Sequence, residues 1–139
     1  MEDIKKILHE GKAGHSLVIK TASGDVFSFD GRGISDLMRL LNTSPDTLKG
    51  ARLADKVVGK AAAALMTLGG VVELYASLIS DGALCLLKGT GLKVSYDKRT
   101  DHIVNRDGTD WCPMEKACRD CLTAGECLER INKLITNKI

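Results

Sequence analysis

Residues Asp55–Ser77 read DKVVGKAAAALMTLGGVVELYAS, and this stretch decides the class of fold that the sequence predicts. Small and apolar side chains leave little polar face over 56–68, which predicts a buried helix with Asp55 as its N-cap. The pair Gly69-Gly70 supplies the turn that commonly ends a helix. Val71–Ser77 then has the mostly apolar composition of a central strand.

The flanking segments alternate between strand and helix patterns. Two β-prone runs, Ser16–Lys20 and Asp25–Phe29, are separated by four residues that include a glycine, which is typical of a hairpin. An apolar stripe at helical spacing follows over 34–41, and Ser80-Asp81 can cap a further helix before a strand at Leu92–Tyr96. The helix–strand alternation indicates right-handed crossovers. The predicted class is therefore α/β, a mixed sheet with an N-terminal hairpin and helices on its faces.

Composition excludes several classes of protein. The chain has 139 residues, 44% of them hydrophobic, which fits one folded unit rather than a disordered chain. A net charge of +2 and an aromatic fraction of 4% give little material for a nucleic-acid-binding surface. We therefore expect no nucleic-acid partner.

The opening residues and the cysteines bear on the compartment. Met1–His9 has the pattern of an amphipathic helix and lacks the apolar core of a secretory signal. Ala61–Ser80 approaches the length of a membrane span, but the glycine pair interrupts it. The five cysteines are then expected as thiols or metal ligands rather than disulfides. These patterns predict a cytoplasmic protein with no membrane partner, and they leave a homo-oligomer open.

Three phrases carry a resemblance to a known family. They are residues 54–63 (ADKVVGKAAA), the Gly-Gly-Val-Val start of the predicted strand, and residues 105–115, which end in CPME. With the hairpin, they resemble a small uncharacterised prokaryotic family, a domain of unknown function with a cytidine-deaminase-like fold. The resemblance implies a three-layer α/β/α sandwich around a mixed sheet of five strands. It covers 1–115 as a deaminase-like domain and leaves 116–139 as a cysteine-containing helical extension packed on it.

The chemistry of zinc deaminases is absent from the matching helix starts. Those enzymes need His- or Cys-x-Glu at one helix start and Pro-Cys-x-x-Cys at the next. Here the first helix start reads DKVVGK over 55–60, and the second reads ISDGA over 79–83, with no cysteine before Cys85. The resemblance therefore implies a deaminase-like scaffold without the hydrolytic zinc.

Two lysines suggest a ligand site on that scaffold. Lys56 and Lys60 are four residues apart and would share one face of the predicted helix near its N-terminus, where cations are disfavoured unless an anion compensates them. Asp55 would act as cap and counter-charge, and Gly59 would permit close approach of an anionic or nucleotide-like ligand. Lys60 is also a candidate catalytic residue. The alternative is that both lysines extend into solvent.

The loop of residues 105–115 is a second candidate site. A cysteine at a helix start can have a lowered pKa and act as a nucleophile, which makes Cys112 a candidate catalytic residue with an acidic neighbour such as Glu115 as base. Asn105 and Arg106 would bind the ligand, and the Arg106 guanidinium would pair with a carboxylate or phosphate group of that ligand. The alternative is a purely structural turn.

Four cysteines crowd into the last third of the chain with the spacing C-x5-C-x2-C-x5-C. Such a set could hold zinc or an iron–sulfur cluster, although the spacing matches no standard zinc-ribbon or ferredoxin pattern. The tentative metal ligands are Cys112, Cys118, Cys121 and Cys127. The remaining cysteine, Cys85, is expected in the core.

These observations leave the function open between classes. The first hypothesis is a protein that binds, and in an enzyme would transform, a small anionic or nucleotide-like ligand on a deaminase-like scaffold. The second is a redox or regulatory module whose C-terminal cysteines bind zinc or an iron–sulfur cluster. A third is a protein-interaction subunit. The sequence does not decide whether the protein is an enzyme.

Overall fold

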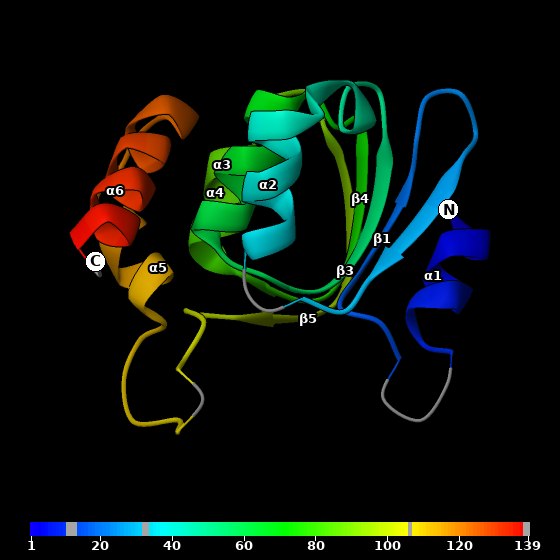
Figure 1. The fold of residues 1–139 in the computed structure, drawn as a ribbon. Helices are drawn as coiled ribbons and strands as arrows, with labels where there is room; N and C mark the ends of the chain where they lie inside the picture. Colours follow the sequence, from blue (N-terminus) through cyan, green and yellow to red (C-terminus); the bar gives the residue numbers. More distant parts are fainter. Residues whose placement is uncertain (11–13, 32–33, 106, 138–139) are drawn as a thin grey trace.

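The chain folds around one mixed sheet of five strands in the order β2-β1-β3-β4-β5 (Figure 1). The computed structural model describes residues 1–10, 14–31, 34–105 and 107–137. β1 pairs with β2 and β3 in antiparallel fashion, whereas β3–β4 and β4–β5 are parallel pairs. The strands are β1 Leu17–Lys20, β2 Val26–Phe29, β3 Arg52–Val58, β4 Glu73–Ser80 and β5 Lys93–Thr100.

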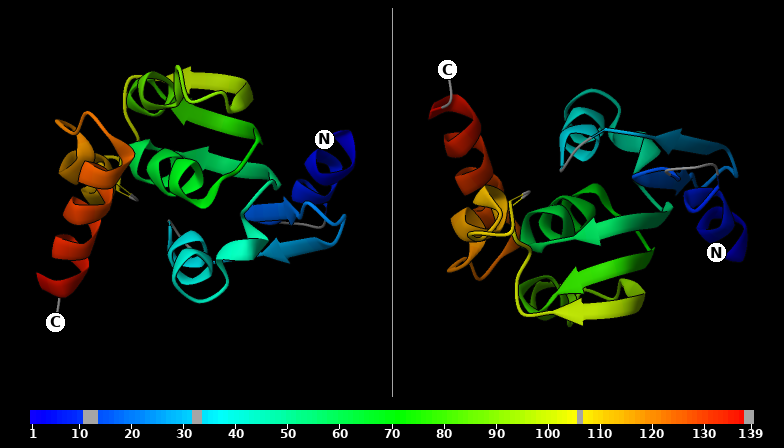
Figure 2. Two further views of the ribbon diagram at one scale, coloured as in Figure 1. Left: turned by 90° about the horizontal axis from the view of Figure 1, so that it is seen from above. Right: turned by 90° about the horizontal axis from the view of Figure 1, so that it is seen from below.

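Helices cover both faces of the sheet (Figures 1 and 2). On one face, Ile4 and Leu8 of α1 pack with Val18, Ala54 and Tyr75 in a small buried cluster. On the other, α2, α3 and α4 enclose the main core, and α5 and α6 lie against the outer side of α3. The helices are α1 Glu2–Leu8, α2 Ser35–Thr43, α3 Lys60–Gly69, α4 Asp81–Leu87, α5 Pro113–Cys118 and α6 Ala124–Asn137, with a 3₁₀ turn at Pro45–Thr47.

The predicted α/β class is confirmed, and so are most of its elements. The hairpin forms with the register Leu17↔Phe29 to Lys20↔Val26. α3 ends where the glycine pair was expected to end it, because Gly70 adopts φ 84°, the left-handed conformation that favours glycine. Ser80 caps α4 as predicted, since its side chain accepts a hydrogen bond from the Ala83 N–H.

The start of the predicted helix at 56–68 is wrong. Residues 52–58 form β3, the middle strand of the sheet, and α3 begins only at Lys60 with Gly59 as its N-cap. Asp55 is therefore not a helix cap, and Lys56 and Lys60 do not share a helix face. The physical reason is tertiary: β3 pairs on both sides, and those pairings outweigh the helix pattern of the residues that follow.

The C-terminal helices share the core of the rest of the chain. The domain boundary predicted after residue 115 falls inside α5, and Cys118, Cys121, Cys127 and Ile131 belong to the main core cluster. Outside the five strands, Val104 and Trp111 form an isolated antiparallel bridge. Within the described part of the chain, no helix has the length and apolar character needed to cross a membrane.

Candidate functional site

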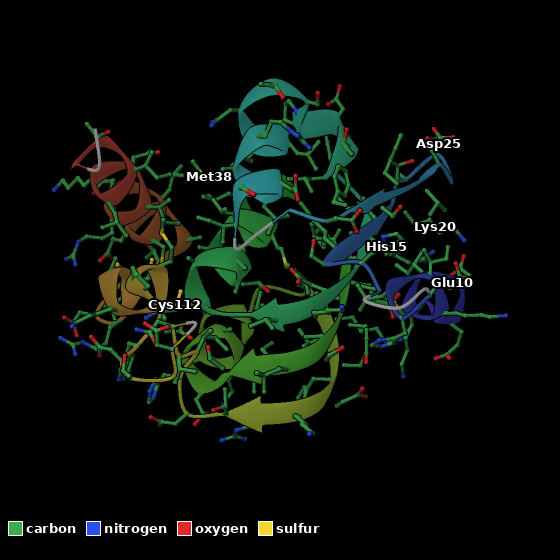
Figure 3. The ribbon with its side chains drawn as sticks, turned by 60° about the horizontal axis from the view of Figure 1, so that its bottom comes forward. Glu10, His15, Lys20, Asp25, Met38 and Cys112 are labelled. Carbon is green, nitrogen blue, oxygen red and sulfur yellow. The ribbon has the colours of Figure 1, made fainter. Side chains whose placement is uncertain are left out.

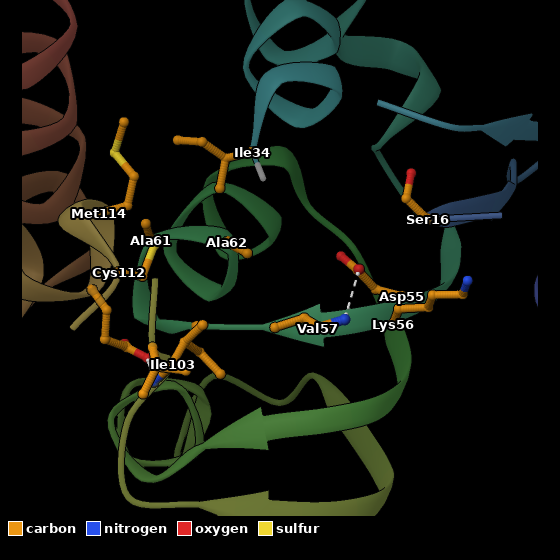
Figure 4. Close-up of a pocket in the computed structure, with 13 residues that line it drawn as sticks. Ser16, Ile34, Asp55, Lys56, Val57, Ala61, Ala62, Ile103, Cys112 and Met114 are labelled. Atoms are coloured by element: carbon orange, nitrogen blue, oxygen red, sulfur yellow. Dashed lines mark hydrogen bonds between the residues drawn. The ribbon is translucent and has the colours of Figure 1, made fainter. Parts of the chain in front are cut away.

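A pocket of about 420 Å³ lies at the carboxyl end of β3, beside the start of β1 (Figure 4). β1 pairs with β3 only over Arg52–Asp55, so the last residues of β3 extend beyond the end of this pairing. The Lys56 N–H still donates to the Ser16 carbonyl at 3.1 Å. The residue before β1, the N-cap of α2, the end of β3, the start of α3 and the segment 103–115 surround the space: Ser16, Ile34, Asp55, Lys56, Val57, Gly59, Ala61, Ala62, Ile103, Val104, Cys112, Met114 and Glu115.

Asp55 is the buried carboxyl group of this pocket. Its side chain projects from β3 into the space beneath α2, and its Oδ1 accepts a hydrogen bond from the Val57 N–H at 3.3 Å (Figure 4). Only 9% of the residue is exposed. Burial raises the pKa of Asp55 to about 7, although the N–H groups of Val57 and Lys56 act in the opposite direction. A carboxyl group with such a pKa can hold or release a proton near neutral pH.

Glu115 forms the opposite wall of the pocket and has a different environment. Its Oε1 accepts hydrogen bonds from the Lys60 N–H at 2.8 Å and the Ser80 hydroxyl at 3.3 Å, and its Oε2 accepts one from the Ile103 N–H at 2.8 Å. The carboxylate thus joins the starts of α3 and α4 to the segment before α5. These hydrogen bonds give an acceptor to backbone N–H and hydroxyl groups that would otherwise be buried without a partner.

The structure brings together several of the predicted site residues. Asp55, Lys56, Gly59 and Cys112 all line the pocket. Cys112 is half-buried at the start of α5, on the side of the molecule away from His15 (Figure 3). The His102 ring stacks on Trp111, the residue before Cys112, with ring centroids 4.1 Å apart.

Other predicted site residues lie elsewhere. Lys60 does not line the pocket, because its ammonium group donates to the carbonyl groups of Arg119 and Cys121 beyond the end of α5. Asn105 shapes its own loop, with Oδ1 accepting from the Thr109 N–H at 3.1 Å. Arg106 lies outside the described residues. The expected anion site at paired lysines is therefore wrong in its geometry, although Asp55, Lys56 and Gly59 do meet at one pocket.

Sequence reasoning missed the part that Glu115 plays. A glutamate in the first turn of a helix ordinarily indicates a favourable interaction with the helix dipole, and nothing local marks it as a cap for two other helices. It also missed the apolar walls, chiefly Ile34, Ala62 and Met114. The Ala-rich pattern of α3 was the available signal, because small side chains on a helix beside a sheet leave room for a cavity.

The tail cysteines separate into a cluster of three and a lone residue. Cys118, Cys121 and Cys127 are buried together between α5 and α6, whereas Cys112 lines the pocket. Hydrogen bonding with the Cys127 thiol lowers the pKa of Cys118, and the same contact raises the pKa of Cys127. Among the described residues, no three His, Cys, Asp or Glu side chains are placed so that they could hold a metal ion. Cys85, expected in the core, is exposed.

Comparison with known proteins gives a family but no activity. Residues 3–135 match the family described as TM1506, domain of unknown function (DUF1893). The crystal structure of a DUF1893 family protein (TM1506) from Thermotoga maritima superposes with a TM-score of 0.82 at 25% sequence identity, over 99% of this chain and 88% of that one. A comparison with curated proteins finds no match. The family predicted from the sequence phrases is thus confirmed: this chain belongs to the DUF1893 family of proteins of unknown function.

Proposed function

We propose that this protein binds a small molecule in the pocket between β3, α3 and the start of α5. The observation that carries the proposal is the Asp55 carboxyl group, which is buried yet faces a cavity of about 420 Å³. Ligand pockets commonly have volumes of roughly 300–1,000 Å³ and apolar walls with a few placed polar groups. The position agrees with the general tendency of α/β sheets to bind ligands beside strand ends.

We further propose that the scaffold is cytidine-deaminase-like, a three-layer α/β/α sandwich. Two features support this: α1 lies on one face of the sheet and α2–α4 on the other, and two crossover units follow the hairpin. In a zinc deaminase, the starts of two such crossover helices carry the metal ligands and the catalytic glutamate. Here the corresponding helices are α3 and α4.

The groups at these two helix starts do not fit a zinc ion. Gly59 and Lys60 begin α3, and Ser80 and Asp81 begin α4, so the imidazole and thiolate ligands of that chemistry are missing from both. The carboxylate between them belongs to Glu115 and is already engaged by three hydrogen-bond donors. We therefore derive no zinc-dependent hydrolysis for this chain, and any reaction would depend on Asp55 as acid or base and on Cys112 as nucleophile.

A thermal-shift screen of nucleotides, free bases and phosphorylated metabolites tests the proposed function. Ala62 lines the pocket on α3, and Ala62→Leu would place three further carbon atoms in the cavity. We expect at least one class of compound to raise the melting temperature of the wild-type protein and of the matched surface variant Lys88→Ala, but not that of Ala62→Leu. The absence of any stabilising compound would overturn the proposal.

The second candidate, a metal or redox site at the C-terminal cysteines, retains one supporting observation. The thiols of Cys118 and Cys121 each lie within hydrogen-bonding reach of the Cys127 thiol. Anaerobic purification followed by metal analysis and a visible spectrum tests it. Stoichiometric zinc or a brown chromophore that is lost in Cys121→Ser would support this candidate, and metal-free protein with freely titrating thiols would remove it.

Two other features bear on location and partners, namely the cysteines and the net charge. The five cysteines are free thiols, which supports the expectation of a cytoplasmic protein. The partner expected is a small molecule rather than a nucleic acid, since the chain carries a net charge of only +2.

A further inference from the structure

The environment of Asp55 restricts the chemistry of the ligand. A carboxylate has about four acceptor sites, and the backbone N–H groups of Lys56 and Val57 use only part of this capacity. The residue is nine-tenths buried, so water replaces the missing donors poorly. Its side chain points into the pocket (Figure 4).

The rest of the pocket offers little to compete for polar groups of a ligand. Apolar side chains form most of its wall, namely Ile34, Val57, Ala61, Ala62, Ile103 and Met114. The Ser16 hydroxyl already donates to the Phe29 carbonyl at 2.9 Å, and the Glu115 carboxylate already accepts three hydrogen bonds on its two oxygens. Between the two carboxyl groups of the wall, Asp55 therefore keeps more acceptor capacity for donors on a ligand.

A buried carboxylate selects strongly by charge and by donor pattern. Two adjacent N–H groups on one planar unit can reach both carboxylate oxygens, which gives the short, charge-assisted pairing familiar from guanidinium–carboxylate contacts. A negative group on the ligand would be repelled at this end of the pocket, where the dielectric constant is low. Apolar walls on either side of the carboxyl group then suit an apolar ring better than a flexible polar chain.

We propose that the pocket takes a small planar molecule that presents two adjacent N–H donors to Asp55, such as an amidinium, a guanidinium or an amino-substituted nitrogen heterocycle. The inference rests on the proposed function, since it assumes that the pocket is a ligand site, and it replaces the anionic ligand expected from the sequence. Lys56 lines the same pocket, so a negatively charged compound has to be included in the test.

Benzamidine, benzamide and benzoate are suitable probes because they share one ring and differ in charge from positive through neutral to negative. Their affinities are measured at pH 8 by protein-observed NMR titration. We expect benzamidine to bind at least tenfold more tightly than benzamide, and benzoate to cause no saturable shift. Lowering the pH from 8 to 6 should weaken benzamidine binding by up to about tenfold per pH unit below the carboxyl pKa, because the proton and the ligand compete for one group.

Matched variants separate the role of Asp55 from a general effect of charge. Asp55→Asn keeps the volume of the side chain and removes its charge, so benzamidine affinity should fall at least tenfold while benzamide changes little. Asp46→Asn, at an exposed position in the 3₁₀ turn, removes the same formal charge elsewhere and should leave both affinities unchanged. Equal benzamidine affinity in Asp55→Asn and wild type would overturn the inference.

Failure of this inference can be distinguished from failure of the proposed function. Benzoate binding that Ala62→Leu abolishes would keep the pocket as a ligand site but overturn the donor class. Stabilising compounds in the metabolite screen whose effect is the same in Asp55→Asn would do the same. No binding by any of the three probes, together with no stabilising compound in the screen, would overturn both.

Discussion

Asp55 and Glu115, the two carboxyl side chains buried in the described part of the chain, line the same pocket but differ in how well hydrogen bonds compensate their burial. Glu115 is 4% exposed and accepts three hydrogen bonds, two of them at 2.8 Å. Asp55 is 9% exposed, and its Oδ1 receives one side-chain–backbone bond of 3.3 Å. Burial removes the hydration of a carboxylate, and hydrogen bonds from protein donors compensate for that loss. Glu115 thus holds the helix starts together, whereas Asp55 has few hydrogen bonds to compensate its burial, which supports the proposed ligand site.

The largest effect expected is from Glu115→Ala, because it removes the acceptor shared by Lys60 N–H, Ile103 N–H and the Ser80 hydroxyl. Leaving such donors buried should lower the free energy of unfolding by about 3–5 kcal/mol. Urea denaturation at pH 7 measures this loss. Glu115→Gln keeps one acceptor oxygen and should lose less, so that a protein too unstable to study in the first variant remains measurable in the second. An unchanged urea midpoint in both variants would contradict the role assigned to Glu115.

Substitution of Asp55 should change the free energy of unfolding in the opposite direction, towards higher stability at alkaline pH. Its pKa is about 7 in the folded protein and 3.8 in the unfolded chain, so between these values the folded state binds more protons. Stability therefore falls as the pH rises from about 4 to 7 and remains at the lower level above it. Asp55→Asn should remove this slope and raise the free energy of unfolding at pH 8 on the order of 2–4 kcal/mol. Urea midpoints measured from pH 5 to pH 8.5 give the comparison, and a wild-type stability that rises with pH would refute it.

A substitution of Lys60 tests whether this residue contributes to stability or to ligand binding. Its ammonium group donates to the Arg119 carbonyl at 3.2 Å and to that of Cys121, so it ties α3 to the segment between α5 and α6. Lys60→Met retains the aliphatic stem and should lose about 1–2 kcal/mol of stability. The exposed Lys88→Met serves as its control. Ligand affinity should be equal in both variants, and a selective loss of affinity in Lys60→Met would restore the anion site expected from the sequence.

The elements that the sequence predicts well are those with a local signal. The hairpin has its glycine-containing turn, α4 has the Ser80 cap, and Gly70 ends α3. β3 has no such signal, because Asp55 and Lys56 interrupt its apolar residues and resemble a helix start. Its position between β1 and β4 is a property of the assembled sheet.

The site follows the same rule. Asp55, Lys56, Gly59 and Cys112 were selected from local phrases, and the fold does bring them to one pocket. The hydrogen bonds of Glu115 instead join residues 12, 35 and 55 positions apart, and no pattern within one element encodes contacts of that separation. Lys60 was assigned to the site for the converse reason, since only the tertiary structure shows that its amine has carbonyl partners.

The smallest expected effect comes from two glycines that flank the Glu115 carboxylate. A Cβ at Gly59 would lie 3.1 Å from Oε2 of Glu115 and 3.3 Å from Ile103, and the carboxylate cannot retreat without lengthening its hydrogen bonds. Gly59→Ala should therefore cost about 1 kcal/mol. A Cβ at Gly82, in the first turn of α4, would meet Lys60 at 3.5 Å and Glu115 at 3.8 Å, which are ordinary contacts.

Gly82→Ala should accordingly be neutral or stabilising by up to about 0.5–1 kcal/mol, because alanine loses less backbone entropy in a helix. The two substitutions add the same methyl group on either side of one carboxylate. Opposite signs in their urea midpoints would reflect the tight contacts of a Cβ at Gly59 with Glu115 and Ile103, together with the entropy gained at Gly82. If both substitutions stabilise the protein, Glu115 is free to move, and its contrast with Asp55 lies in burial alone rather than in the hydrogen bonds that fix it.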